Sequence, residues 1–86
     1  MTLADEIIQH LQNLEPTSVD LTDESAMHAG HKGNGGGAHF KLKITSSHFC
    51  GKSQIMRHRL IYQSLNKLIP QKIHALSIQA IATNEG

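Results

Sequence analysis

The sequence predicts an α+β fold in which two helices pack on one face of a three-stranded sheet. Two segments repeat apolar residues at helical spacing, and three segments alternate apolar and polar residues as strands do. Their order along the chain is helix, strand, strand, helix, strand. Packing both helices on one face is the simplest way to bury their apolar stripes against the sheet. The whole chain, residues 1–86, has the length of a single domain.

Both predicted helices have recognisable ends. The first spans residues 2–15, where Thr2 can cap the first turn and Pro16 closes the segment. The second begins after Ser53, another candidate cap, and runs to about Leu68. The apolar stripe of the second helix is expected to comprise Met56, Leu60, Ile61, Leu65 and Leu68.

The three predicted strands occupy residues 17–23, 39–45 and 73–83. Residues 24–37 between the first two strands contain five of the seven glycines, which predicts a flexible Gly/His-rich hairpin loop. Residues 46–51 are expected to form a turn. The second helix then acts as a crossover, and its hand should be right-handed if the last strand runs parallel to its neighbour.

Composition excludes several classes of protein. Eight Lys and Arg residues nearly balance seven Asp and Glu residues, which argues against binding of nucleic acid by bulk charge alone. The single cysteine excludes an internal disulfide and a Cys-rich zinc site. The acidic start of the chain is unlike a signal peptide, and no apolar run has membrane-spanning length. We expect a soluble, cytoplasmic protein without a membrane partner.

Several blocks of sequence resemble the BolA family in both order and spacing. The resemblance covers residues 17–83, and its upstream part joins an Asp-Glu-Ser motif at 23–25 to a histidine-containing loop. The order of elements is that of a KH-like (class II) topology. The four downstream blocks are HFKLKI at 39–44, SHFCG at 47–51, RHRLIY at 57–62 and IHALSI at 73–78.

The resemblance implies a non-enzymatic adaptor with no small-molecule substrate. Members of the family form heterodimers with monothiol glutaredoxins of the Cys-Gly-Phe-Ser type, and these complexes carry a shared [2Fe–2S] cluster. The family is associated with iron–sulfur trafficking and iron regulation. By the same resemblance, His74 is one expected ligand, and the loop supplies the other: His28 by its offset from the Asp-Glu-Ser motif, or the nearby His31.

The residues alone favour simpler roles for these histidines. His74 shares its strand parity with Leu76 and Ile78, so it is expected to point toward the core side, where a structural histidine is common. His28 and His31 form an H-x-x-H pair, which by itself is a weak zinc signal. A simple divalent-metal binder is therefore a third candidate. Because thiolates and carboxylates are lacking at ligand spacing, it is the least supported.

A DNA-binding regulator is the main alternative function, because some bacterial members of the family are described as transcription regulators. On the second helix, Arg57 is expected to lay its stem on the core with its guanidinium in water, and Arg59 to face solvent. His58 is expected on the flank of the helix. The residues expected to contact an acidic partner or DNA are Arg59, Lys52, Lys67 and Lys72.

The remaining ligand-type side chains have no predicted role. His10, His39 and His48 are expected on the surface, and Cys50 is expected to be a partly buried thiol in the turn after the second strand. No hydrolase or protease constellation surrounds Cys50 in the sequence.

Overall fold

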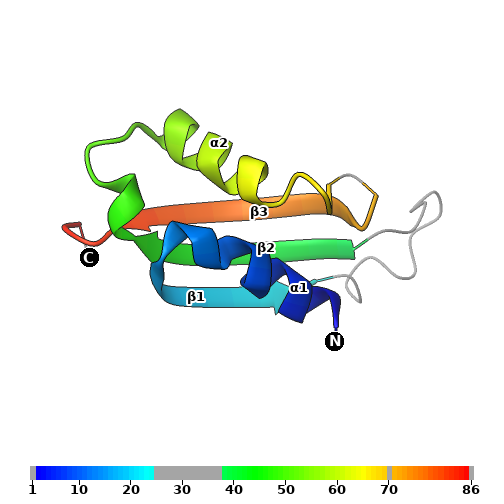
Figure 1. The fold of residues 1–86 in the computed structure, drawn as a ribbon. Coiled ribbons are helices and arrows are strands. Elements are labelled where there is room, and N and C mark those ends of the chain that lie inside the picture. Colours follow the sequence, from blue (N-terminus) through cyan, green and yellow to red (C-terminus); the bar gives the residue numbers. More distant parts are fainter. Residues whose placement is uncertain (1, 25–37, 70, 86) are drawn as a thin grey trace.

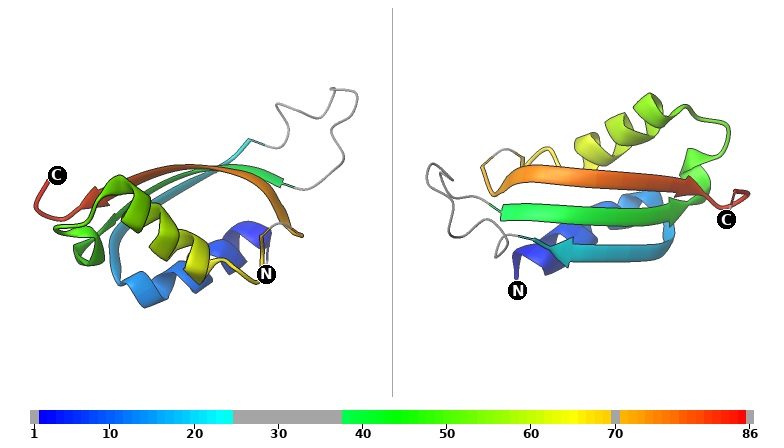
Figure 2. Two further views of the ribbon diagram at one scale, coloured as in Figure 1. Left: turned by 90° about the horizontal axis from the view of Figure 1, so that it is seen from above. Right: turned by 180° about the vertical axis from the view of Figure 1, so that it is seen from behind.

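The computed structural model of the protein describes residues 2–24, 38–69 and 71–85. Two helices lie on one face of a three-stranded sheet, and no helix or strand of the described residues covers the other face (Figures 1 and 2). The predicted α+β class and order of elements are confirmed. The elements are α1 (Leu3–His10), β1 (Pro16–Asp23), β2 (Ala38–Ser46), α2 (Gln54–Ser64) and β3 (Ile73–Ala82), with short 3₁₀ helices η1 (Leu11–Leu14) and η3 (Ser47–Phe49).

The sheet has the order β1-β2-β3. β1 and β2 form the predicted antiparallel hairpin, with Asp23 opposite Phe40 and Pro16 opposite Ser46. β2 and β3 are parallel, as expected for strands joined through a helix. The first residues of β2 and β3 therefore lie at the same end of the sheet.

The first helical segment consists of two helices rather than one. Thr2 and Asp5 form a capping box, in which the Asp5 amide donates to Thr2 Oγ1 at 3.1 Å and the Thr2 amide donates to Asp5 Oδ2 at 3.2 Å. The α-helical part ends at His10, and the chain continues as the tighter η1. Glu15 then adopts a left-handed conformation with φ of 49°, which turns the chain into β1.

α2 is shorter than predicted. The hydroxyl of Ser53 accepts from the Met56 amide at 3.2 Å and caps its start, as expected, but the regular helix ends at Ser64. Turns follow it as far as Ile69. Leu65 and Leu68 still reach the core.

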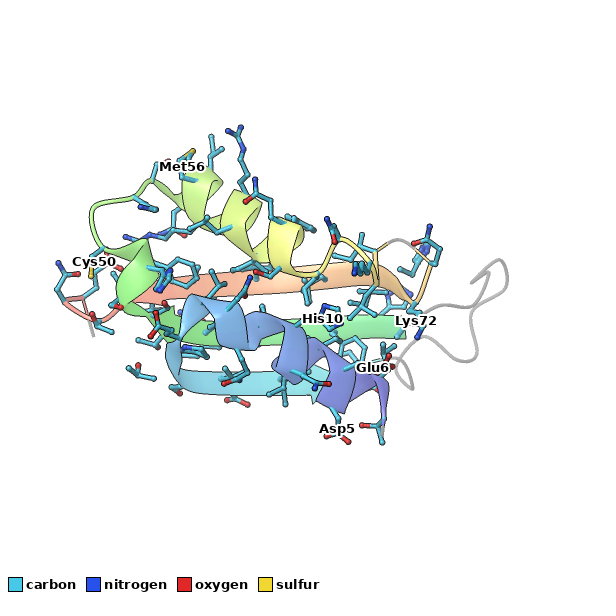
Figure 3. The ribbon with its side chains drawn as sticks, viewed as in Figure 1. Asp5, Glu6, His10, Cys50, Met56 and Lys72 are labelled. Atoms are coloured by element: carbon cyan, nitrogen blue, oxygen red, sulfur yellow. The ribbon has the colours of Figure 1, made fainter. Side chains whose placement is uncertain are left out.

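The prediction that Met56 belongs to the core stripe is wrong. Arg57 takes the sheet-facing position in the first turn of α2, and the neighbouring Met56 points outward with 40% of its surface exposed. Figure 3 shows Met56 on the side of α2 that faces away from the sheet.

The core fills the space between the helices and the sheet. Its largest fully buried side chains include Phe49, Ile7, Leu11 and Ile61. Among the described residues, Ser46 and Arg57 are the polar side chains buried with them. The hydroxyl of Ser46 donates to the carbonyl oxygen of Leu14 and accepts from the His48 amide. In the described part of the chain, no helix is both long and apolar enough to span a membrane.

Candidate functional site

The candidate site lies where β2 and β3 begin. Both strands start at this end of the sheet because they are parallel, and the amide of Ala38 donates to the carbonyl oxygen of Lys72 at 3.3 Å. β1 ends here too, since the amide of Glu24 donates to the carbonyl oxygen of His39 at 2.7 Å. Glu24 and Ala38, the described residues on either side of segment 25–37, therefore lie at the same end of the sheet as the start of β3.

A β-bulge sets the direction of His74. Ala38 pairs with Ile73 and His39 pairs with Ala75, so His74 is an additional residue in β3. Ile73 is buried, with 1% of its surface exposed, whereas His74 is exposed. The prediction that His74 points toward the core side is therefore wrong. The bulge places the apolar Ile73 in the core and leaves the imidazole in water, where its polar atoms need no protein partner.

His39 lies directly beside His74. Their ring centroids are 5.2 Å apart and the ring planes are inclined by 46°. His39 is half-buried, and the prediction that it is a surface residue without a role missed this neighbour. The parallel pairing of β2 with β3, which the sequence left open, is what brings the two histidines together.

The pair is suited to metal binding but is incomplete alone. Neutral imidazole is a ligand for iron, zinc and copper, and two histidines replace two cysteines on one iron of Rieske clusters. Among the residues with described positions, no three His, Cys, Asp or Glu side chains form a metal-binding group. Further ligands must come from a partner or from outside those residues.

The predicted loop ligands lie outside the described residues. His28 follows Glu24 by four positions and His31 by seven.

The four predicted basic residues do not form one cluster. Lys72 pairs with Glu6 of α1 at 3.2 Å, near the histidine end (Figure 3). Lys52 precedes α2, Arg59 lies on its exposed side and Lys67 follows its last turn. α2 has 11 residues, about 16 Å of helix, so it separates Lys52 from Lys67.

One protein-family model matches most of the chain. Residues 11–85 match the family model described as BolA-like protein. The chain belongs to the BolA family. This membership agrees with the resemblance seen in the sequence.

Individual BolA relatives support the same conclusion. The chain is 43% identical over 75 residues to SufE-like protein 1 of Arabidopsis thaliana, which covers 80% of this chain and 20% of that protein. The solved BolA domain of that protein superposes with a TM-score of 0.85 at 39% identity, covering 100% of this chain and 99% of the domain. The chain is also 35% identical to a Vibrio cholerae protein named DNA-binding transcriptional regulator BolA, covering 83% of this chain and 65% of that protein. The chain thus spans less than two thirds of either relative.

Two other histidines of this BolA domain make structural contacts. The Nδ1 atom of His10 lies 3.3 Å from the carbonyl oxygen of Ser64 and ties α1 to the end of α2. His48 Nε2 lies 3.1 Å from Glu15 Oε1. His10 was expected on the surface and is half-buried.

Arg57 anchors the end of the chain. Its stem packs on the core as predicted, but its guanidinium is bound by protein groups rather than by water. It donates to the carbonyl oxygens of Lys52 and Ala80 at 2.9 and 3.1 Å and to both carboxylate oxygens of Glu85 at 2.6 and 2.7 Å. The hydrogen bonds from Arg57 lower the pKa of the Glu85 carboxyl to about 2, helped by the amide of Ala82, and Glu85 in turn raises the pKa of Arg57.

Cys50 lies next to this anchor and is half-buried in a turn, as predicted. Its Sγ atom is 3.4 Å from Thr83 Oγ1. That hydrogen bond, with smaller backbone contributions from Thr83 and Asn84, lowers the pKa of the thiol. Cys50 follows the far end of β2, away from His39, which argues against a shared metal site.

Proposed function

We propose that this chain is a non-enzymatic adaptor that binds a monothiol glutaredoxin and provides histidine ligands to a [2Fe–2S] cluster shared by the two proteins. The observation that supports the proposal is the His39–His74 pair, which lies at the same end of the sheet as Glu24 and Ala38, the described residues on either side of the predicted loop. Membership of the BolA family supports it as well. The role would lie in iron–sulfur trafficking or iron regulation.

The available donors fit such a cluster. Two imidazoles can take the place of two thiolates on one iron, and the partner would then supply sulfur ligands to the other. We assign His74 as one ligand and one of His28, His31 or His39 as the second. The exposure of His74 leaves its ring accessible to a partner protein without any change in the core.

The test is to mix the purified protein with a cluster-loaded monothiol glutaredoxin and to record visible circular dichroism. The spectrum is expected to change with the wild-type protein and to stay that of glutaredoxin alone with His74→Ala. His28→Ala, His31→Ala and His39→Ala, tested separately, identify the second ligand. His48→Ala is the matched control because that ring pairs with Glu15. A spectrum that the wild-type protein leaves unchanged, or that responds equally to His74→Ala, contradicts the proposal.

DNA binding is a second candidate, favoured by the exposed side chains of Lys52, Arg59 and Lys67 and by the name of the Vibrio cholerae relative. A protein that neutralises phosphates loses affinity steeply as salt rises. Binding of a short duplex should therefore weaken over a salt titration in proportion to the number of phosphate contacts. No binding at ~100 mM salt, or a slope near zero, argues against this function.

A further inference from the structure

The outward side of α2 carries an unusual concentration of exposed apolar side chains. Large hydrophobic residues with substantial exposure are few in the described part of the chain, and three of the four lie on this one helix. Ile55 has 73% of its surface exposed, Met56 40% and Tyr62 43%, whereas the fourth, Ile8 on α1, has 37%. Removal of apolar surface from water is favourable, and Ile55 in particular gains little of this stabilisation within the monomer.

These residues form one continuous surface. Positions 55, 59 and 62 follow each other at helical spacing on the side opposite the buried Arg57 and Ile61. Arg59 connects them, since its Nη1 atom lies 3.8 Å from the sulfur of Met56. We call Ile55, Met56, Arg59 and Tyr62 the α2 patch.

The stretch of sequence that contains α2 carries charges of one sign. Residues 50–84 contain five Lys and Arg residues and no Asp or Glu. Two of these cations are engaged in ion pairs, Arg57 with Glu85 and Lys72 with Glu6. Within the described residues, no ion pair is formed by the other three, which are Lys52, Arg59 and Lys67.

The composition of the α2 patch favours a protein as its occupant. Methionine, tyrosine and arginine are enriched at the centres of protein interfaces, and lysine is depleted there. A nucleic-acid backbone would pair with the cations but would leave Ile55 and Met56 in contact with water and phosphate. An apolar protein surface edged with carboxylates complements both the side chains and the charge.

The α2 patch is remote from the histidine pair. The guanidinium of Arg57, in the first turn of α2, bonds to the carbonyl oxygen of Ala80, six residues beyond His74 along β3. At ~3.3 Å per strand residue this corresponds to about 20 Å. In Figure 3, Met56 and Lys72 accordingly lie at opposite ends of the molecule.

We propose that the α2 patch is a docking surface for a second protein that presents an apolar surface bordered by acidic side chains, and that it binds independently of the histidine end. A partner on the α2 patch and a partner at the histidine pair can then be held by one chain at the same time. The docking surface does not depend on the iron–sulfur proposal, because its residues include none of the candidate ligands.

The experiment uses the full chain and a synthetic amphipathic helical peptide with leucines along one side and glutamates on both borders. In ¹H–¹⁵N NMR titrations, the largest shifts are expected at Ile55, Met56, Arg59 and Tyr62. Ile55→Ser or Arg59→Glu should weaken binding roughly tenfold or more. Ile8→Ser is the matched control because it removes the other exposed isoleucine, and it should bind as the wild type does. A peptide with lysine in place of glutamate should not bind.

Unfolding curves of Ile55→Ser should match those of the wild type, since this side chain is mostly in water. Shifts confined to the region of His39 and His74, or equal affinity of Ile55→Ser, would overturn the proposal. It is also overturned if a DNA duplex, and not the acidic peptide, binds through Arg59. Sedimentation provides the last check: self-association of the wild type that Ile55→Ser removes would make a second copy of this chain the occupant.

Discussion

His39 and His74 come from different strands, yet their rings are neighbours with centroids 5.2 Å apart. The parallel pairing of β2 with β3 brings the two backbones together, and the additional residue in β3 turns the second ring outward beside the first. The contact is therefore produced by backbone register and requires no metal.

Replacement of His74 should change the NMR signals of His39. The His39 ring lies within the range of ring-current and contact effects from its neighbour, so His74→Ala is expected to shift its Cε1–H and Cδ2–H resonances. His48→Ala should leave them in place because His48 contacts Glu15 instead. Unmoved His39 signals in His74→Ala would show that the rings do not meet in solution.

Ser46→Ala should destabilise the fold by more than the loss of the small hydroxyl volume alone would. The Ser46 hydroxyl donates to Leu14 and accepts from the His48 amide, so its removal leaves two backbone groups without this partner. Loss of such a buried partner costs about 1–3 kcal/mol. Urea denaturation should show this decrease in the free energy of unfolding, whereas the exposed neighbour Ser47→Ala should stay close to wild type.

Ser53→Ala should shorten or fray the start of α2. The hydroxyl of Ser53 accepts from the Met56 amide, and loss of an N-cap of this type costs about 1 kcal/mol. Ser53→Asp should retain the stability because aspartate caps helices as well as serine does and its charge suits the helix dipole. Thermal unfolding compared with Ser77→Ala, on the uncovered face of the sheet, is the measurement. Equal melting temperatures for Ser53→Ala and Ser77→Ala would contradict this role.

The contribution of the Arg57–Glu85 pair to the free energy of unfolding should depend on pH. The pKa of Glu85 is lowered from 4.5 to about 2 in the folded protein. Its contribution is therefore fully present above about pH 5, decreases as the pH falls from there, and is lost near pH 2. Glu85→Gln should be less stable than wild type at pH 7, and the difference in urea midpoint should narrow between pH 5 and 3. Asp20→Asn controls for net charge, and a pH-independent difference would contradict the prediction.

Cys50 should react faster than an ordinary thiol of equal exposure. The Thr83 hydroxyl is the main cause of its lowered pKa, and thiolate rather than thiol reacts with alkylating agents. Thr83→Val should raise that pKa and slow alkylation by iodoacetamide at neutral pH. The alkylation rates of the wild-type protein and of Thr83→Val, measured from pH 6 to 10, should become equal at the alkaline end, where the Cys50 thiol is ionised in both proteins. A constant rate ratio over this range would instead indicate a change in access.

Periodicity is sufficient to predict the helices, the strands and their order, because each buries a regular apolar side. It fails where the backbone departs from regular geometry. The parity rule that directs His74 inward assumes an uninterrupted ladder, and the bulge breaks that assumption. The α-helix that was expected to continue to Leu68 ends at Ser64, although burial continues beyond it.

The candidate site was only partly predictable for a related reason. His74 stands out in the sequence through its family resemblance, whereas His39 acquires meaning only from its neighbour across the sheet. The sequence predicts that Arg57 packs on the core, and this is confirmed. Its partner Glu85 is distant in sequence and lies in a turn, where no periodic pattern marks it. Pairings between distant segments depend on tertiary structure, which local patterns do not encode.

Because of the β-bulge, the orientation of the His74 ring depends on the number of residues at the start of β3. A point substitution elsewhere in β3 does not change the side of the sheet that the remaining side chains of the strand face. Loss of Ile73 would instead straighten the ladder and put His74 opposite Ala38, in the place that Ile73 takes inside the core. To transfer His74 to another sheet with the same orientation, the additional residue would have to be transferred too. In a strand without the bulge, a histidine at this position would face the core.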